Sequence, residues 1–199
     1  DDHYTIREYI RNFIMSKLET NTIDTVSGTT NLVIGSTNSS TVTFESGAAT
    51  GHMYPAFEAY LSASQTGLTD GANVKLQADT EVFDTGNFYD NSTNYRFTPT
   101  VAGKYLVYAN TMQEAATAGL LIWNTTMIYK NGSAYRSIRN RPDNANNSGE
   151  LSVYVDAVIE LNGSTDYVEI YGSGNTTSGN WEFQELNKTN YFGAYRIGA

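Results

Sequence analysis

Residues 74–108 read VKLQADTEVFDTGNFYDNSTNYRFTPTVAGKYLVY. Both ends of this stretch are rich in β-favouring residues, and its middle is rich in Asn, Asp, Gly and Thr, which favour turns. It closes on Phe97-Thr-Pro-Thr-Val-Ala-Gly103-Lys-Tyr105, where a glycine separates a proline-containing turn from an apolar run. A side chain at Gly103 would crowd a sheet, so the pattern predicts that a buried strand starts at this glycine.

The β pattern continues on both sides of this stretch, from about Tyr54 to Ala199. Gly and Asn mark turns at 69–73, 130–133, 161–164 and 172–175, and no convincing helical periodicity interrupts them. The expected strands are 57–64, 74–83, 94–99, 103–113, 119–130, 133–139, 150–160, 166–172, 181–186 and 190–197. Strands at this spacing predict an all-β sandwich over residues 54–199.

Five residues carry a more specific signature, namely Phe97, Gly103, Tyr105, Phe192 and Gly193. In this order they resemble the trimeric jelly-roll superfamily of tumour necrosis factor and of the globular head of complement component one, subcomponent q. The segments 129–132 and 158–168 resemble further turns of that family. The sequence departs from the family pattern where Val107 and Ala109 stand in place of aromatic residues.

The resemblance implies a jelly-roll knob that forms a homotrimer and buries one sheet against its neighbours. It also implies binding and display rather than catalysis, since members of this family serve as ligands and recognition heads. Heads of this type occur at the tips of bacteriophage and viral fibres, which is an argument from likeness of fold.

Bulk composition narrows the classes of partner. The chain has 199 residues, a net charge of −9, 17% charged residues and no cysteine. The negative charge disfavours binding to a nucleic-acid backbone, and no apolar run approaches the about 20 residues needed to cross a bilayer. The absence of cysteine excludes disulfides and favours assembly in a reducing cytoplasm. The sequence starts without a secretory signal pattern, in keeping with that expectation.

Residues 1–19 are expected to contain an N-terminal α-helix. Thr5-x-x-Glu8 is a capping-box pattern, and apolar residues follow at helical spacing. These apolar residues are Ile6, Ile10, Phe13, Ile14 and Leu18. A helix this short needs a partner for its apolar face. We predict anchoring or assembly, with packing on the chain's own knob as the alternative.

Residues 20–53 are rich in Thr, Ser and Gly, with short apolar pairs such as Leu32/Ile34 and Val42/Phe44 at intervals of roughly ten residues. Each short segment holds only two or three apolar residues, which do not build a core within one chain. Three chains wound around one axis would bring enough of them together. We predict a short-strand β shaft, and a flexible polar linker is the alternative.

No catalytic, metal or cofactor site is expected. The two histidines, His3 and His52, lie outside the predicted strands. Neither is therefore held on a rigid scaffold, as the histidine of a catalytic serine–histidine pair must be. Glu182 and Glu185 are expected on opposite faces of one strand. Asp84, Asn87, Asp90 and Asn91 offer hard oxygen ligands for calcium near one turn, but turn-forming residues explain them better.

The segment 136–149 is the best candidate for ligand recognition. It carries Arg136, Arg139, Arg141, Asp143 and Asn144 in an amide-rich context. Arginine binds carboxylate or sulfate with two parallel hydrogen bonds, so an acidic sugar is a plausible class of ligand. The alternatives are a solvated hairpin loop, or arginines that pair with acidic groups on a neighbouring subunit. Trp123 and Trp181 are better explained as core residues than as sugar platforms.

Together these features favour a short, homotrimeric fibre of a bacteriophage, displayed on the virion surface. Its N-terminal helix would bind other virion proteins, and its knob would bind a host-surface glycan or receptor. One alternative is a capsid or tail decoration protein with a purely structural role. Another is a free bacterial or secreted lectin-like binding module.

The predicted helix leads to a direct test. Replacing Ile10 and Phe13 with Ser should release the protein from its mount or its trimer while leaving the knob folded, because both changes place polar groups on the apolar stripe. The measurement is incorporation of the variant into particles, with the circular dichroism of the purified chain as the control. Unchanged incorporation would contradict the anchoring role.

Overall fold

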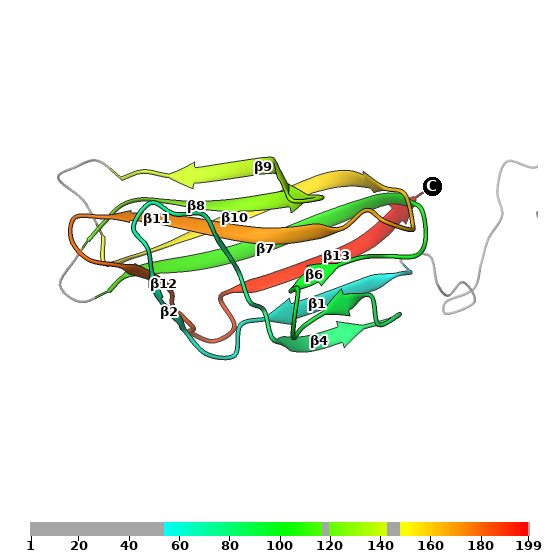
Figure 1. Cartoon of the computed structure of the whole chain (residues 1–199), viewed down its shortest axis with the longest axis horizontal. Helices are drawn as coiled ribbons and strands as arrows, with labels where there is room; N and C mark the ends of the chain where they lie inside the picture. The colour runs from blue at the N-terminus through cyan, green and yellow to red at the C-terminus, as the bar shows by residue number, and fades with distance from the viewer. Residues whose placement is uncertain (1–53, 117–119, 143–147, 199) are drawn as a thin grey trace, which may run out of the picture. The chain divides into compact units, whose positions relative to one another are not determined.

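The computed structural model describes residues 54–116, 120–142 and 148–198. These residues belong to a compact unit, Ala49–Ala199, and form two antiparallel sheets that pack face to face (Figure 1). The predicted helix and shaft, residues 1–53, lie outside the described residues, as do Asp143 and Asn144. None of the described residues belongs to a helix that is long and apolar enough to cross a membrane.

Sheet A contains seven of the strands that the structure describes, in the order β2-β12-β7-β13-β1-β4, with β10 on the other side of β7. Their bounds are β1 Ala56–Tyr60, β2 Gln65–Leu68, β4 Thr80–Asp84, β7 Gly103–Ala115, β10 Glu150–Leu161, β12 Trp181–Phe183 and β13 Tyr191–Gly198. The long strand β7 pairs with β10 along one side and with β13 and β12 along the other. It is the central strand of the sheet.

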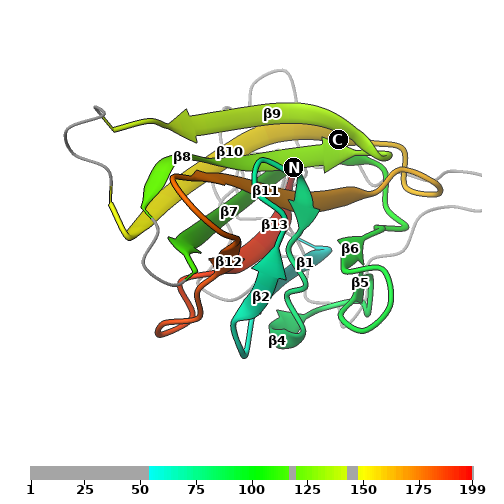
Figure 2. The same ribbon diagram turned by 60° about the vertical axis from the view of Figure 1, so that its left-hand side comes forward.

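Sheet B contains the other six described strands, in the order β5-β6-β11-β8-β9, with β3 also pairing with β11. Their bounds are β3 Val74–Lys75, β5 Tyr89–Asp90, β6 Arg96–Phe97, β8 Leu121–Lys130, β9 Ser133–Asn140 and β11 Val168–Thr176. Strand β9 pairs only with β8 and forms an edge of the sheet (Figure 2). The two antiparallel sheets confirm the predicted all-β sandwich.

Several expected strands differ from those in the structure. The strand expected over 166–172 continues to Thr176, so the turn expected at 172–175 is wrong, and the strand expected over 181–186 ends at Phe183, before Glu185. The segment 74–83 was expected to be one strand, but Val74–Lys75 joins sheet B and Thr80–Asp84 joins sheet A. The segment 57–64 ends as a strand at Tyr60, and a separate strand, β2, follows and pairs with β12. At this break the Asp79 carboxylate accepts hydrogen bonds from the backbone N–H and the hydroxyl of Ser62.

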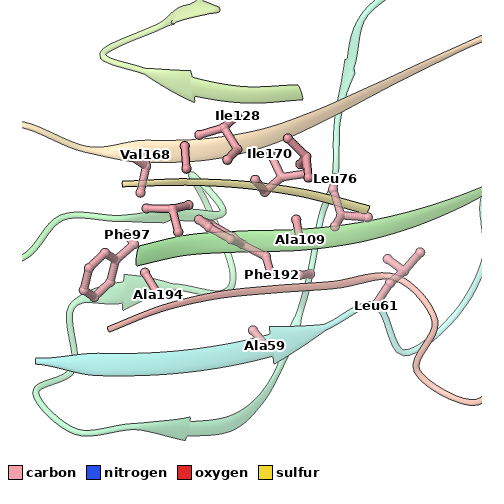
Figure 3. Packing of buried hydrophobic residues seen from close by; sticks show 14 of the residues in the cluster. Ala59, Leu61, Leu76, Phe97, Ala109, Ile128, Val168, Ile170, Phe192 and Ala194 are labelled. Atoms are coloured by element: carbon pink, nitrogen blue, oxygen red, sulfur yellow. The ribbon is translucent and has the colours of Figure 1, made fainter. Parts of the chain in front are cut away.

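The core lies between the sheets and follows the alternation of side chains along each strand. In β1 the second and fourth residues, Phe57 and Ala59, are buried, and the other three are partly exposed. Figure 3 shows Ile128, Val168 and Ile170 of sheet B facing Ala59, Ala109 and Ala194 of sheet A across this layer. The small side chains leave room for large rings beside them.

An aromatic cluster fills that room. Phe57 stacks on Tyr89 and on Phe97, with ring centroids 4.6 and 4.5 Å apart, and meets Phe192 edge-on at 4.8 Å. Phe97 in turn contacts Tyr105. The signature residues Phe97, Tyr105 and Phe192 therefore belong to one packed group. The group joins β1 and β13, the strands of sheet A that come first and last along the chain.

Gly103 and Gly193 are required by close approaches. Gly103 has a φ of +150°, and a Cβ at this position would lie 2.3 Å from the carbonyl oxygen of Gly198. A Cβ on Gly193 would lie 2.4 Å from the ring of Tyr108. Side chains cannot fit at either position unless their neighbours move, which confirms the crowding expected at Gly103.

A polar layer lies further along the same core. The hydroxyls of Thr111 and Thr126 are hydrogen-bonded at 2.6 Å across the two sheets, and the Asn124 amide donates to the Gln113 side-chain carbonyl. The Gln113 amide donates to Thr111 Oγ1 and to a backbone carbonyl of β8. All four side chains are buried, so these bonds offset the cost of removing polar groups from water.

The aromatic cluster predicts the stability of one variant. Replacing Phe57 with Ala should lower the free energy of unfolding by about 3–5 kcal/mol, because a buried ring is lost and a cavity remains. The exposed Val82 on β4 supplies the control, since Val82→Ala should change stability by less than about 0.5 kcal/mol. Urea unfolding measures both values. Equal effects of the two substitutions would contradict the proposed packing.

Candidate assembly and recognition surfaces

The outward side of sheet A carries a surface that we call the tyrosine face. It consists of Tyr60 on β1, Tyr108 on β7, Tyr154 on β10, and Tyr191 and Tyr195 on β13. The strand register aligns Tyr60, Tyr191, Asn110 and Tyr154 in one row across four strands. These side chains alternate with core residues along each strand, so the core packing fixes which way they point.

Tyr108 and Glu58 occupy the middle of the tyrosine face. The Tyr108 hydroxyl donates a 2.8 Å hydrogen bond to Glu58 Oε2, across Gly193 on the strand between them. Burial and this bond raise the pKa of Tyr108 well above its ordinary value, so its hydroxyl stays protonated near neutral pH. The carboxylate thus has a partner within its own chain.

The edges of the sandwich beside the tyrosine face expose further apolar groups. The exposed fractions are 50% for Tyr135, 41% for Ile138 and 50% for Val158, on the edge strands β9 and β10. Side chains of β9 contact the β10 backbone, because Tyr135 donates to the Val158 carbonyl and Arg136 to the Asp156 carbonyl. We call Tyr135, Ile138 and Val158 the β9/β10 edge.

The structure separates the arginines of the predicted recognition segment. Arg136 and Arg139 lie three residues apart on β9 and therefore point to opposite sides of the strand. Arg136 faces β10, whereas Arg139 faces the outward side of sheet B. Arg141 follows the strand and is exposed.

Arg139 is held in place by two contacts. Its guanidinium carbon lies 4.1 Å from the ring centroid of Trp123, and its Nε donates a 3.0 Å hydrogen bond to Thr125 Oγ1. Trp123 is only partly buried, unlike Trp181, which is fully buried and donates from Nε1 to the Thr69 carbonyl. The expectation of a core position therefore holds for Trp181 but not for Trp123.

The acidic side chains considered for metal binding serve turns instead. Asp84 accepts hydrogen bonds from the backbone N–H groups of Gly86 and Tyr89. Asp90 accepts from three successive N–H groups, of Ser92, Thr93 and Asn94, and these bonds lower its pKa. Across the described ranges, His, Asp and Glu side chains form no group of three or more that could hold a metal ion.

Glu182 belongs to a row of carboxylates. It lies directly opposite Glu114 on β7, which in turn lies opposite Glu150 on β10. Burial and the charge of Glu114 raise the pKa of Glu182. Sequence reasoning placed Glu182 correctly on a strand but missed this row, because cross-strand register is set by contacts distant in sequence.

No family model and no curated protein matches this sequence. Two crystal structures of murine APRIL, at pH 5.0 and at pH 8.0, each match with a TM-score of 0.51 and with 10% and 12% identity, respectively. Each alignment covers 71% of this chain and 98% of the matched chain. The structure of Eiger TNF from S. frugiperda matches with a TM-score of 0.47 at 10% identity, over 72% of this chain and 91% of that one. At these identities the likeness to the two APRIL structures shows the fold alone, and it confirms the predicted jelly roll of the tumour necrosis factor type.

The Arg139 contacts lead to a spectroscopic prediction. Replacing Arg139 with Ala should make tryptophan fluorescence more accessible to acrylamide, because one ring face of Trp123 loses its cover while Trp181 stays buried. The loss of stability should stay below about 1 kcal/mol. Arg136→Ala is the matched control, since Arg136 does not contact Trp123. Identical quenching in the two variants would contradict the stacked arrangement.

Proposed function

We propose that this chain is a non-enzymatic, homotrimeric attachment protein, a short fibre of a bacteriophage virion whose knob binds a host-surface glycan. The observation that carries the proposal is the tyrosine face. A set of five tyrosines on the outward side of one jelly-roll sheet is a larger aromatic surface than a monomer needs, and such surfaces mark contacts between proteins.

A ring of three subunits requires two different surfaces that fit each other, since each subunit contacts the next in the same direction. The tyrosine face supplies one surface, and the β9/β10 edge, with its exposed Tyr135 and Ile138, supplies the other. Glu58 can enter such an interface without losing its hydrogen bond, because its partner Tyr108 belongs to the same chain. This hydrogen bond lowers the cost of burying the carboxylate.

The sequence before the knob supports the fibre. Its amphipathic helix pattern suits a mount on other virion proteins, and its Thr/Ser/Gly-rich repeats suit a threefold shaft. Three knobs on one shaft, and many fibres on one particle, would turn weak single sites into firm attachment. A decoration protein would share the trimer but bind no host molecule, and a free lectin-like module would be recovered as a trimer without particles.

The tyrosine face predicts the mass of one variant. The chain shortened to residues 49–199, its compact unit, should be a trimer by light scattering, and Tyr191→Asp should convert it to a monomer. The reason is that the substitution places a charge in a buried interface. Tyr171→Asp is the matched control, because Tyr171 is a partly buried tyrosine on the outward side of the other sheet.

The control should remain trimeric. A monomeric parent chain, or a Tyr191→Asp variant that stays trimeric, would overturn assembly through the tyrosine face. Circular dichroism of each variant shows that the sandwich is folded, so that loss of the trimer is not confused with loss of the fold.

A further inference from the structure

The outward side of sheet B differs chemically from the tyrosine face. Its register places Ser173, Thr125 and Arg139 in one row across three strands. The next row contains Lys75, Tyr171, Met127 and Ser137, and Tyr129 follows beyond it on β8. We call Trp123, Thr125, Arg139, Tyr129 and Tyr171 the arginine–aromatic face.

Arg139 presents a fixed positive charge on this face, with no ionic partner among the residues that the structure describes. The stack on Trp123 and the bond from Nε to Thr125 hold the guanidinium plane. Among the described residues, no acceptor is hydrogen-bonded to its two terminal nitrogens, and the ion pairs there are Lys75–Glu169 and Lys130–Asp166. A planar guanidinium held in this way is ready to form two parallel hydrogen bonds with a carboxylate.

A stacked pair of aromatic rings lies on the same face as this charge. Tyr129 and Tyr171 stack on each other, with centroids 4.1 Å apart and an interplanar angle of 26°. Tyr171 is two residues along the strand and two strands across from Arg139, with β8 between them, so their backbone positions are roughly 12 Å apart at ordinary strand spacings. This spacing is comparable with the length of two sugar residues, whose C–H faces pack against aromatic surfaces. The neighbouring β9 residues on this side, Ala134 and Ser137, are small and leave the rings uncovered from that direction.

One polar group in the Arg139 row lacks a partner. The Ser173 hydroxyl is buried and makes no hydrogen bond, although the residue points to the outward side of sheet B. Buried hydroxyls without partners are rare in folded proteins. A water enclosed beside this row would satisfy it.

We propose that the arginine–aromatic face binds a carboxylate-bearing saccharide. The Arg139 terminal nitrogens donate to the sugar carboxylate, and the Tyr129–Tyr171 stack packs against a further sugar ring of the same oligosaccharide. Charge complementarity favours this ligand, because the residues that the structure describes leave Arg139 without an ionic partner on this face and pair the nearby Glu169 with Lys75. This proposal rests on the glycan attachment proposed above, and it names the ligand class and the location.

The test uses the full chain and a hexamer of galacturonic acid, with the methyl ester of the same hexamer as the uncharged control ligand. Isothermal titration should show binding of the acid, and binding of the ester should be at least about tenfold weaker, since a charged pair of hydrogen bonds is lost. Arg139→Gln should weaken binding of the acid by a similar factor. Arg139→Lys should also weaken binding of the acid, because lysine keeps the positive charge but cannot form the two parallel hydrogen bonds of a guanidinium.

Arg136→Gln is the matched control, since it removes the same charge from the same strand but on the opposite side. It should leave binding of the hexamer unchanged. Equal binding of acid and ester, equal loss in the two Gln variants, or no binding of the acid by an intact trimer would each overturn this proposal while leaving the assembly in place. A monomeric full chain would instead contradict the proposed fibre.

Discussion

The register of strand β7 is the constraint on which the rest of the structure depends. Tyr105, Val107 and Ala109 point into the core, so Leu106, Tyr108 and Asn110 must point outward. Strands β10 and β13 are aligned to β7 on its two sides, and the rows of the tyrosine face follow from that alignment. A slip of one residue would exchange the two sets, placing the Tyr108 hydroxyl in the core and Val107 in water. Gly103 opposes such a slip, because only a residue without a side chain fits beside the Gly198 carbonyl.

Much of this arrangement could be predicted from local sequence. Strands 103–113 and 150–160 were predicted within two residues at each boundary, because their apolar alternation is long and their turns carry Gly or Asn. Strand 133–139 was predicted as closely from the Asn131-Gly132 turn before it. The segment 74–83 was not predicted correctly. Its division between two sheets depends on the side chains of Gln65 and Asp79, which form hydrogen bonds across loops. The separation of Arg136 from Arg139 follows from their odd spacing once β9 is known to be a strand. The tyrosine face carried no local signal beyond alternation, since its rows join residues as distant as Tyr60 and Tyr191.

The two outward faces treat charge in opposite ways, and this division suits a trimeric binding protein. On the tyrosine face the Glu58 carboxylate accepts a hydrogen bond within its own chain, so contact with a neighbour leaves it with a donor. On the arginine–aromatic face the acidic group, Glu169, is paired with Lys75, and among the described residues the rigidly held Arg139 has no ionic partner. The first surface is suited to permanent burial and the second to reversible contact with an anion.

Strand β1 has a mechanical consequence. It is hydrogen-bonded to β13 on one side and to β4 on the other, and its Phe57 is clamped in the aromatic cluster. The ladder between β1 and β13 joins five residue pairs, from Ala56 to Tyr60. A pull on the chain at Pro55 that acts along the axis of β1 loads these pairs together in shear. It does not open them one at a time. If the knob tethers a particle to a surface, tension between the two enters the sandwich through this ladder.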